Sequence, residues 1–307
     1  MHVAGWLSVP PKRTMDVLLI LIHGGVYTHA YWDMPYKPEI YSCVQWAYER
    51  GISTLNLDRL GNGESTHPSG KDLTLAVHAE SLRQIIDTIR SEGVLGHRFE
   101  RLIPVGHSMG SLTAGLSQAT YGNADAVVLT GLTGVNVVGI SDQPEAVDGM
   151  LTMFQPVSKE PLLESKSHRY DEYYYSMPLA SRLRMFFHVP AVEREVIDLD
   201  LSLQGTQTLG ESQTCGMAYD SVIRMPGPVL VEMGEFDAFF MGSETNGFND
   251  ANLVRDASRA HAEAIAKAPA NFTVADMFKD CGHNLTQHPN AHESYEAMAK
   301  WIRELGF

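Results

Sequence analysis

Residues 102–112, which read LIPVGHSMGSL, decide the fold. The first half is an apolar run typical of a buried strand, and the second half leads into a helical stretch rich in small residues. A strand that turns sharply into a helix must hold the residue at the turn in a strained conformation, and glycines two positions before and after it let neighbouring backbone pass close by. The sequence therefore predicts that Ser108 stands at this turn, with its hydroxyl above the edge of a sheet. An ordinary glycine-rich turn is the alternative.

Short apolar runs alternate with helical patterns on both sides of this stretch, as expected for parallel strands joined by crossover helices. The predicted strands are residues 17–22, 52–57, 101–105, 126–129, 228–233 and 271–278. The predicted helices are residues 73–89, 112–121, 251–268 and 291–304. Asn290 is predicted to cap the last helix, with Glu293 three residues later as in a capping box. The fold class is α/β, with a mostly parallel, doubly wound sheet.

The alternation breaks between residues 134 and 225. Structureless loops longer than about 15 residues are rare in compact domains, so a segment of this length is expected to fold. Residues 145–154 and 179–187 have helical patterns within it. We predict a core built from residues 1–133 and 226–307, and a helical lid, or cap, inserted at 134–225. A plain helical subdomain with its own core is the alternative.

Composition excludes several classes of protein. The chain has 307 residues, 44% of them hydrophobic, and a net charge of −14, which disfavours binding to nucleic acid or to an anionic membrane surface. Its three cysteines, Cys43, Cys215 and Cys281, are too few and too scattered for a disulfide framework or a zinc site, and are typical of reduced thiols. No secretory signal is visible, and the apolar run at 17–22 is far shorter than the ~20 residues of a membrane span. We expect a cytosolic protein.

A serine is a poor nucleophile unless an imidazole takes its proton and a carboxylate orients that imidazole. Asp237 follows the predicted strand at 228–233 in the sequence GEFD, and His283 follows the strand at 271–278 in CGHN. Because the carboxyl ends of parallel strands meet at one edge of a sheet, Ser108, Asp237 and His283 are expected to converge there as nucleophile, acid and base.

Other assignments are weaker. Glu235 is a rival acid, but its side chain is expected to point to another part of the turn. Asp125 precedes a strand, which places it at the opposite edge of the sheet. His107 is expected to face away from the site as a packing residue. His288 and His292 are separated by a Pro-Asn break, so they do not share a helix face and predict no metal site.

The HGG sequence at residues 23–25, the turn around Ser108, Asp237 in GEFD and His283 in CGHN together resemble the α/β-hydrolase fold superfamily. The resemblance covers residues 1–133 and 226–307. Members with a Ser–Asp–His triad act as esterases, lactonases, thioesterases, amidases, peptidases or C–C bond hydrolases, and the branch with an inserted lid is the most similar. Dehalogenases and epoxide hydrolases carry an aspartate where this chain has Ser108, which disfavours those two activities.

An acyl transfer also needs donors for the oxyanion that forms at the carbonyl. One is expected to be the backbone N–H of Met109, the residue after the nucleophile. The second should come from the loop after the strand at 17–22, where the Gly25 N–H is favoured over that of Gly24 or Val26. His23 is expected to prop this loop by hydrogen bonding.

The expected function is a serine hydrolase that cleaves a small, fairly apolar ester, lactone or thioester through an acyl-enzyme on Ser108, without a cofactor. The partner is then a small-molecule acyl substrate. A C–C bond hydrolase or lyase acting on a ketone with the same residues stays open, as does a ligand-binding receptor on a hydrolase scaffold. Arg182, Arg184 and the tyrosines at 173–175 are candidates for lining a pocket, and the sequence predicts no oligomeric state.

Overall fold

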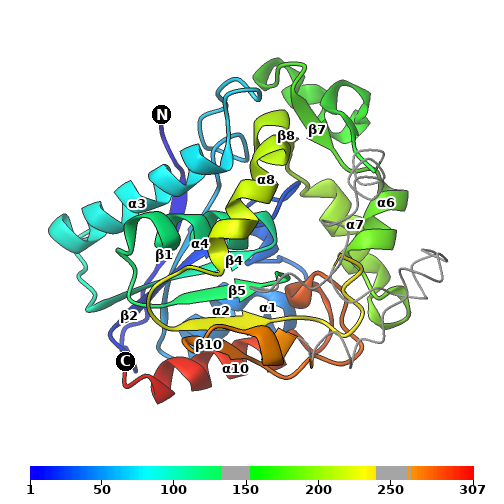
Figure 1. Cartoon of the computed structure of the whole chain (residues 1–307). Helices are drawn as coiled ribbons and strands as arrows, with labels where there is room; N and C mark the ends of the chain where they lie inside the picture. The colour runs from blue at the N-terminus through cyan, green and yellow to red at the C-terminus, as the bar shows by residue number, and fades with distance from the viewer. Residues whose placement is uncertain (133–152, 240–261, 263) are drawn as a thin grey trace.

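The structure is a computed structural model, and it describes residues 1–132, 153–239, 262 and 264–307 (Figure 1). Within these ranges, seven strands form one sheet in the order β1-β3-β2-β4-β5-β9-β10. All neighbours are parallel except β1, which pairs antiparallel with β3 at one edge. The strands are β1 (Gly5–Ser8), β2 (Val17–Ile22), β3 (Ser53–Leu57), β4 (Arg101–His107), β5 (Val127–Thr130), β9 (Val229–Glu232) and β10 (Phe272–Val274).

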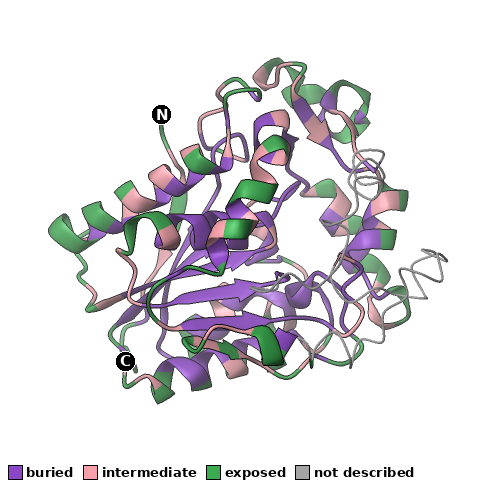
Figure 2. Ribbon diagram, viewed as in Figure 1, coloured by how far each residue is buried: buried purple, intermediate pink, exposed green. Residues whose placement is uncertain are grey.

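Helices cover both faces of this sheet. The α-helices on one face are α3 (Leu75–Glu92), α4 (Met109–Tyr121) and α8 (Leu209–Val222), and those on the other are α1 (Pro38–Tyr41), α2 (Cys43–Glu49) and α10 (Ala291–Glu304). Strand β2 shows why its six residues are all apolar: Leu18, Ile20 and Ile22 join the hydrophobic cluster beneath α3 and α4, and the residues between them join the opposite cluster. Figure 2 shows the inner strands of the sheet as the buried centre of the molecule, whereas the edge strands β1 and β10 are partly exposed.

The predicted strands and helices that fall on described residues are present, with ends shifted by a few residues. Strand β10 is shorter than predicted, although an isolated bridge between Gly234 and Phe278 extends the same parallel pairing. Strand β1 was not predicted, because an edge strand of four partly exposed residues carries a weak alternation signal. The predicted helix at 251–268 lies outside the described residues except for 262 and 264–268.

One detail of the last helix differs from the prediction. Helix α10 begins at Ala291 and ends at Glu304, as expected, but the side chain of Asn290 makes no capping hydrogen bond. It donates instead to the carbonyl of Lys279, 2.8 Å away, in the loop that leads to the helix. The capping-box prediction was therefore wrong, because the backbone of Asn290 (φ −96°, ψ 20°) lacks the extended conformation that directs an N-cap side chain at the helix N–H groups.

The described part of the predicted lid range, residues 153–225, contains both helices and strands. Strands β6 (Gln155–Pro156), β7 (Tyr174–Ser176) and β8 (Gln207–Thr208) form a small antiparallel sheet that the sequence did not predict. Its α-helices are α6 (Leu179–Met185), α7 (Arg194–Ser202) and α8, and its 3-10 helices are η3 (Val157–Lys159), η4 (Pro161–Arg169) and η5 (Val189–Ala191). Elsewhere, η1 spans His29–Tyr31 and η7 spans Leu285–Gln287.

Parts of this range pack into both core clusters: Ala218 and Val222 of α8 join the one beneath α3 and α4, and Met185 of α6 and Val196 of α7 join the opposite one. The helix predicted at 145–154 falls almost entirely outside the described residues. The division into a core and a lid at 134–225 stays a prediction.

Candidate active site

Ser108 occupies the sharp turn between β4 and α4. Its backbone has φ of 52° and ψ of −115°, a conformation that strains a residue with a side chain by about 1–3 kcal/mol. The Ser108 N–H donates to the carbonyl of Thr130 at the end of β5, 2.9 Å away, which fixes the turn to the neighbouring strand. Its side chain is half-buried and makes no capping bond to α4, so the hydroxyl is not used to hold the helix.

Asp237 and His283 meet at the same edge of the sheet. The Nδ1–H of His283 donates to Oδ2 of Asp237 over 2.8 Å, and both side chains are buried. The other oxygen of Asp237 accepts the N–H of Phe239 at 2.9 Å. Glu235, the rival acid, accepts the N–H of Asp280 instead. The geometry therefore places Asp237, and not Glu235, beside the imidazole.

His283 lies next to the turn that carries Ser108. Its ring centroid is 4.7 Å from that of His107, 4.5 Å from that of Phe239 and 5.9 Å from that of Phe186. The imidazole is therefore surrounded by rings, two of them hydrocarbon.

His107 was expected to face away from the site, and this was wrong. One face of its ring stacks on Tyr31 with centroids 4.2 Å apart, and His283 lies against it as well. Because the hydroxyl of Thr130 donates to the Gly106 carbonyl, its oxygen accepts the Nδ1–H of His107. Burial and the neighbouring His283 hold the pKa of His107 well below its usual range, so this second imidazole is neutral. It does pack, as predicted, but it packs against the site.

The loop after β2 lies against the turn at Ser108. A Cβ added to Gly24 would come within 3.3 Å of the Ser108 Cβ, and one added to Gly25 within 3.1 Å of the Met109 Cγ. Few real Cβ atoms have contacts this close, so glycine suits both positions. Within the described part of the chain, the backbone hydrogen bonds outside helices and strands include none donated by the N–H of Gly25 or of Met109.

His23 props this loop, as predicted. Its Nε2 accepts the backbone N–H of Arg59 at 3.0 Å, so the proton of the neutral ring is on Nδ1, which donates to the carbonyl of Gly24 at 2.8 Å. Burial and the nearby Arg59 guanidinium lower the pKa of His23 to about 3, so the ring stays neutral.

The far end of the loop is strained and held by a distant segment. Val26 has φ of 57°, an outlier for a β-branched residue. Its N–H donates to the carbonyl of Thr206 at 3.1 Å, and its carbonyl accepts the N–H of Gly205 at 2.9 Å. These two residues directly precede β8 and α8, so the predicted lid range helps to shape the loop.

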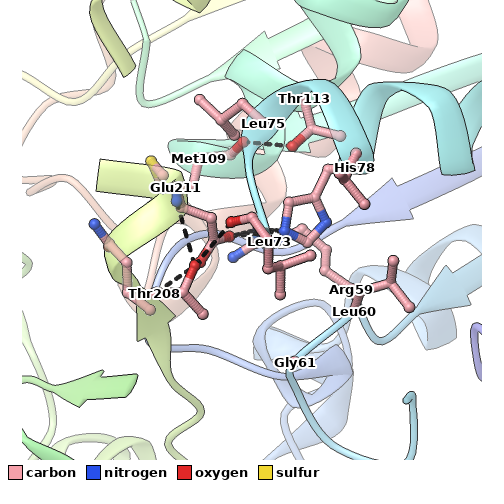
Figure 3. Close-up of polar contacts among 12 residues, drawn as sticks. Arg59, Leu60, Gly61, Leu73, Leu75, His78, Met109, Thr113, Thr208 and Glu211 are labelled. Carbon is pink, nitrogen blue, oxygen red and sulfur yellow. Dashed lines mark hydrogen bonds and ion pairs between the residues drawn. The ribbon is translucent and has the colours of Figure 1, made fainter. Parts of the chain in front are cut away.

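Arg59, which lies in the glycine-rich turn at residues 58–65, was not predicted to belong to the site. Its Nε donates to the carbonyl of His23 at 3.0 Å and its Nη2 to the carbonyl of Gly24 at 3.1 Å. Its Nη1 donates to Glu211 at the start of α8, which also accepts a hydrogen bond from His78 of α3 at 3.0 Å (Figure 3). The position of Arg59, a charged residue at the end of a buried strand, could have indicated a role at the site. No feature of the sequence around Glu211 indicated that it would pair with Arg59.

Opposite charges balance in this buried cluster. Burial acts to raise the pKa of Glu211, but the Arg59 guanidinium and the His78 imidazole more than offset it and hold the pKa well below its usual range. Burial lowers the pKa of His78, so that ring is neutral and donates from Nε2. The cluster is therefore one ion pair with a neutral third member.

Of the candidate pocket residues, Arg182 of α6 is fully buried and donates to Asp200 at 2.6 Å. Its guanidinium also lies over the rings of Tyr27 and Phe186, at 4.7 and 5.2 Å from their centroids. Since Phe186 borders His283, this part of the predicted lid range reaches the site.

The sequence matches the Alpha/beta hydrolase family over residues 19–297. The chain belongs to this family. Solved structures share the fold at low identity: an esterase from Exiguobacterium antarcticum (14% identity, TM-score 0.62, covering 98% of this chain and 95% of the esterase) and a monoacylglycerol lipase from Paleococcus ferrophilus (16%, 0.56, 98% of both chains). A meta-cleavage product hydrolase from Pseudomonas fluorescens IP01 is also similar (15%, 0.55, covering 99% of this chain and 94% of that one). A comparison with curated proteins found no match.

Membership in this alpha/beta hydrolase family supports a hydrolytic enzyme. In the ranges that the structure describes, no helix is long and apolar enough to cross a membrane. No three His, Cys, Asp or Glu side chains among the described residues are grouped so that they could hold a metal ion. Cys281 is buried, and burial raises the pKa of its thiol well above the usual range, which makes it a poor nucleophile.

Proposed function

We propose that the protein is a serine hydrolase that cleaves a small, fairly apolar ester, lactone or thioester through an acyl-enzyme on Ser108. His283 takes the proton of the hydroxyl, and Asp237 holds the imidazole in position. The N–H groups of Met109 and Gly25 bind the oxyanion. No cofactor enters this scheme.

The observation that carries the proposal is the buried hydrogen bond between His283 and Asp237, beside the strained turn at Ser108. A carboxylate on Nδ1 leaves Nε2 as the nitrogen that would act as base. The hydrocarbon rings of Phe186 and Phe239 next to the imidazole support an apolar acyl group. An esterase and a monoacylglycerol lipase are among the similar solved structures, which agrees with this choice.

The reaction has two halves. In the first, Ser108 Oγ attacks the carbonyl carbon as its proton passes to His283, and the tetrahedral oxyanion then collapses, expelling an alcohol or thiol that His283 protonates. In the second, His283 takes a proton from water, the hydroxide attacks the acyl-enzyme, and the acid leaves with Ser108 reprotonated.

A fluorophosphonate probe tests the nucleophile. The wild-type chain should be labelled at Ser108, identified by mass spectrometry of the tagged peptide, and should hydrolyse nitrophenyl esters. Ser108→Ala should lose both properties, with kcat reduced by about 10⁶-fold. If the Ser108→Ala chain hydrolyses esters at the wild-type rate, the proposal is wrong.

A substrate panel then fixes the bond that is cleaved. Acetyl, butyryl and octanoyl esters, a matched thioester, a γ-lactone and a matched 1,3-diketone are compared by kcat/KM and product analysis. Preference for an ester, lactone or thioester supports the proposal, and preference for the diketone assigns C–C cleavage instead. Sluggish labelling of Ser108 together with tight ligand binding would indicate a receptor. A cytosolic location and a small-molecule acyl partner, with neither nucleic acid nor membrane, stay predictions from the sequence.

A further inference from the structure

The side chain of Arg59 binds the back of the loop that supplies the second oxyanion donor. Its Nε and Nη2 donate to the carbonyls of His23 and Gly24, the two residues before Gly25. Arg59 is 4% exposed and belongs to a turn separated from the loop by β3 and the helices before it. These contacts are therefore tertiary, and the loop depends on them for its orientation.

The contact between Arg59 and the Gly24 carbonyl fixes the direction of the Gly25 N–H, because both groups belong to one planar peptide. In the described chain every peptide bond is trans, and in a planar trans peptide the C=O and the following N–H point in opposite directions. The carbonyl of Gly24 points at Arg59 Nη2 and His23 Nδ1. The N–H of Gly25, in the same peptide unit, therefore points away from Arg59. A Cβ added to Gly25 would lie 3.1 Å from the Met109 Cγ and closer still to the Oε1 of Gln207, so this glycine borders both the nucleophile turn and β8.

We infer that Arg59 is a positioning residue for the oxyanion site: it fixes the Gly24–Gly25 peptide so that the Gly25 N–H is aimed at the substrate carbonyl. This rests on the proposed function, since it assigns a role within the same reaction. Arg59 does not touch the substrate. Its effect on rate passes through the peptide that it holds.

A second set of contacts holds Arg59 itself. Glu211 accepts from Nη1 at the start of α8, and Figure 3 shows Arg59, His78 and Glu211 converging from a loop and two helices. Glu211 is also fixed by Thr208, whose backbone N–H it accepts at 2.8 Å. The guanidinium thus bridges α8 to the loop at His23. The orientation of the donor depends on a helix from the predicted lid range.

An ion pair serving stability alone would need only the contact with Glu211. The other two nitrogens of Arg59, Nε and Nη2, instead donate to two successive carbonyls of one loop. A planar guanidinium has the fork of donors that this arrangement requires, and the point charge of a lysine does not. A substitution of Arg59 should therefore alter the transition state more than substrate binding.

The test compares Arg59→Ala, Arg59→Lys and a control, Ile86→Ala. Ile86 is buried on α3, the helix that carries His78, and belongs to the core cluster formed by α3, α4 and α8. Its truncation therefore loosens the packing of these helices without removing a contact to the loop at residues 23–27. Active sites are counted by the end point of fluorophosphonate labelling, so that kcat refers to folded enzyme. KM for a nitrophenyl ester and Ki for a matched trifluoromethyl ketone, which forms a tetrahedral adduct, are measured on each.

Arg59→Ala should reduce kcat per active site by about 100-fold, as expected for loss of an aligned oxyanion donor, with KM changed less than about threefold. Ki for the ketone should rise in proportion to the loss in kcat/KM. Arg59→Lys should lose about tenfold, because one amine holds at most part of the loop. Methylguanidinium at tens of millimolar should raise kcat of Arg59→Ala and leave that of Ile86→Ala unchanged.

Three results would overturn the inference: kcat of Arg59→Ala within threefold of wild type, a loss confined to KM, or an equal loss of kcat in Ile86→Ala. Failure of the proposed function has a different signature, since the wild-type chain itself would then show neither labelling of Ser108 nor hydrolysis. If Arg59→Ala fails to fold, the kcat and Ki of Arg59→Lys decide by the same criteria.

Discussion

The two sides of the loop at residues 23–27 differ in how their hydrogen-bonding groups are used. On the side of Ser108, groups that could act on a substrate stand at the ends of strands, and the hydroxyl and the N–H groups of Gly25 and Met109 are not used to hold the described backbone together. On the side of Arg59, each of the three guanidinium nitrogens donates to a carbonyl or a carboxylate.

The groups on the Ser108 side are those proposed to react, and the groups on the Arg59 side hold the loop in place. Proton transfer requires groups whose charge changes during the reaction, whereas a support must keep one charge state through the cycle. The Arg59–Glu211 pair meets the second requirement, because the pKa of Glu211 is held well below its usual range by its partners. Substitutions on the Ser108 side should therefore abolish activity, and those on the Arg59 side should give graded losses of rate or stability.

The largest effect is expected from Asp237→Asn. Loss of the carboxylate should leave the His283 imidazole in the wrong tautomer and reduce kcat by about 10⁴-fold. The free energy of unfolding should change by much less than the activation free energy of the reaction. Steady-state kinetics on the preferred ester measures the effect. Glu235→Gln is the control, since Glu235 accepts the N–H of Asp280 and Asp237 accepts that of the imidazole. If Glu235→Gln loses more activity than Asp237→Asn, the acid has been misassigned.

The next effect is on stability. Glu211→Gln should leave the Arg59 guanidinium buried without its counter-charge, which destabilises a protein by about 3–5 kcal/mol. Urea unfolding measures the change. Asp198→Asn is the matched control, because it breaks an ion pair with Arg194 on the surface of α7 that should contribute little. Equal stabilities of the two variants would show that the cluster around Arg59 is not a support.

A second buried glutamate provides a contrast in pH dependence. Among the described residues, no cation pairs with Glu232 at the end of β9. The Ser294 hydroxyl donates to it at 2.6 Å, and burial raises its pKa to about 8. The folded chain then binds this proton more tightly than the unfolded chain does. The stabilisation is complete below the ordinary pKa of a glutamate and is lost as pH rises towards about 8. Glu211, with a lowered pKa, contributes equally across that window.

Between pH 6 and pH 9, wild type should lose about 2–3 kcal/mol relative to Glu232→Gln, which copies the neutral acid at every pH. The measurement is urea unfolding of both proteins in one-unit steps of pH. Parallel stability curves for the two chains would mean that Glu232 titrates normally in the folded state.

The smallest effect concerns the start of α8. Thr208 and Glu211 form a reciprocal capping box there, so Thr208→Ala should cost about 1 kcal/mol of stability. Arg59 keeps its contacts in this variant, and kcat per active site should change by less than about twofold. Asn290→Ala is the comparison, because the Asn290 side chain does not cap α10. A larger loss of stability in Asn290→Ala than in Thr208→Ala would contradict both assignments.

The sequence by itself determined the alternation of strands and helices, the turn at Ser108 and the positions of Asp237 and His283 after their strands. These features are local: an apolar run of six residues, such as β2, predicts burial on both faces, and parallel strands bring their carboxyl ends to one edge whatever joins them. The order of Ser108, Asp237 and His283 along the chain was therefore enough to predict their convergence at that edge, where the hydrogen bond between Asp237 and His283 lies.

Only the tertiary structure decided which groups support that edge. Arg59 and Glu211 are 152 residues apart, and neither has a periodic pattern that predicts the other. Their pairing depends on which helix covers α3 and α4, and α8 does so from within a range whose fold the sequence left open. The same applies to His107, whose neighbours are set by β5 and by the loop after β10. A buried charge needs a partner, but the long-range packing of the chain determines which residue is that partner.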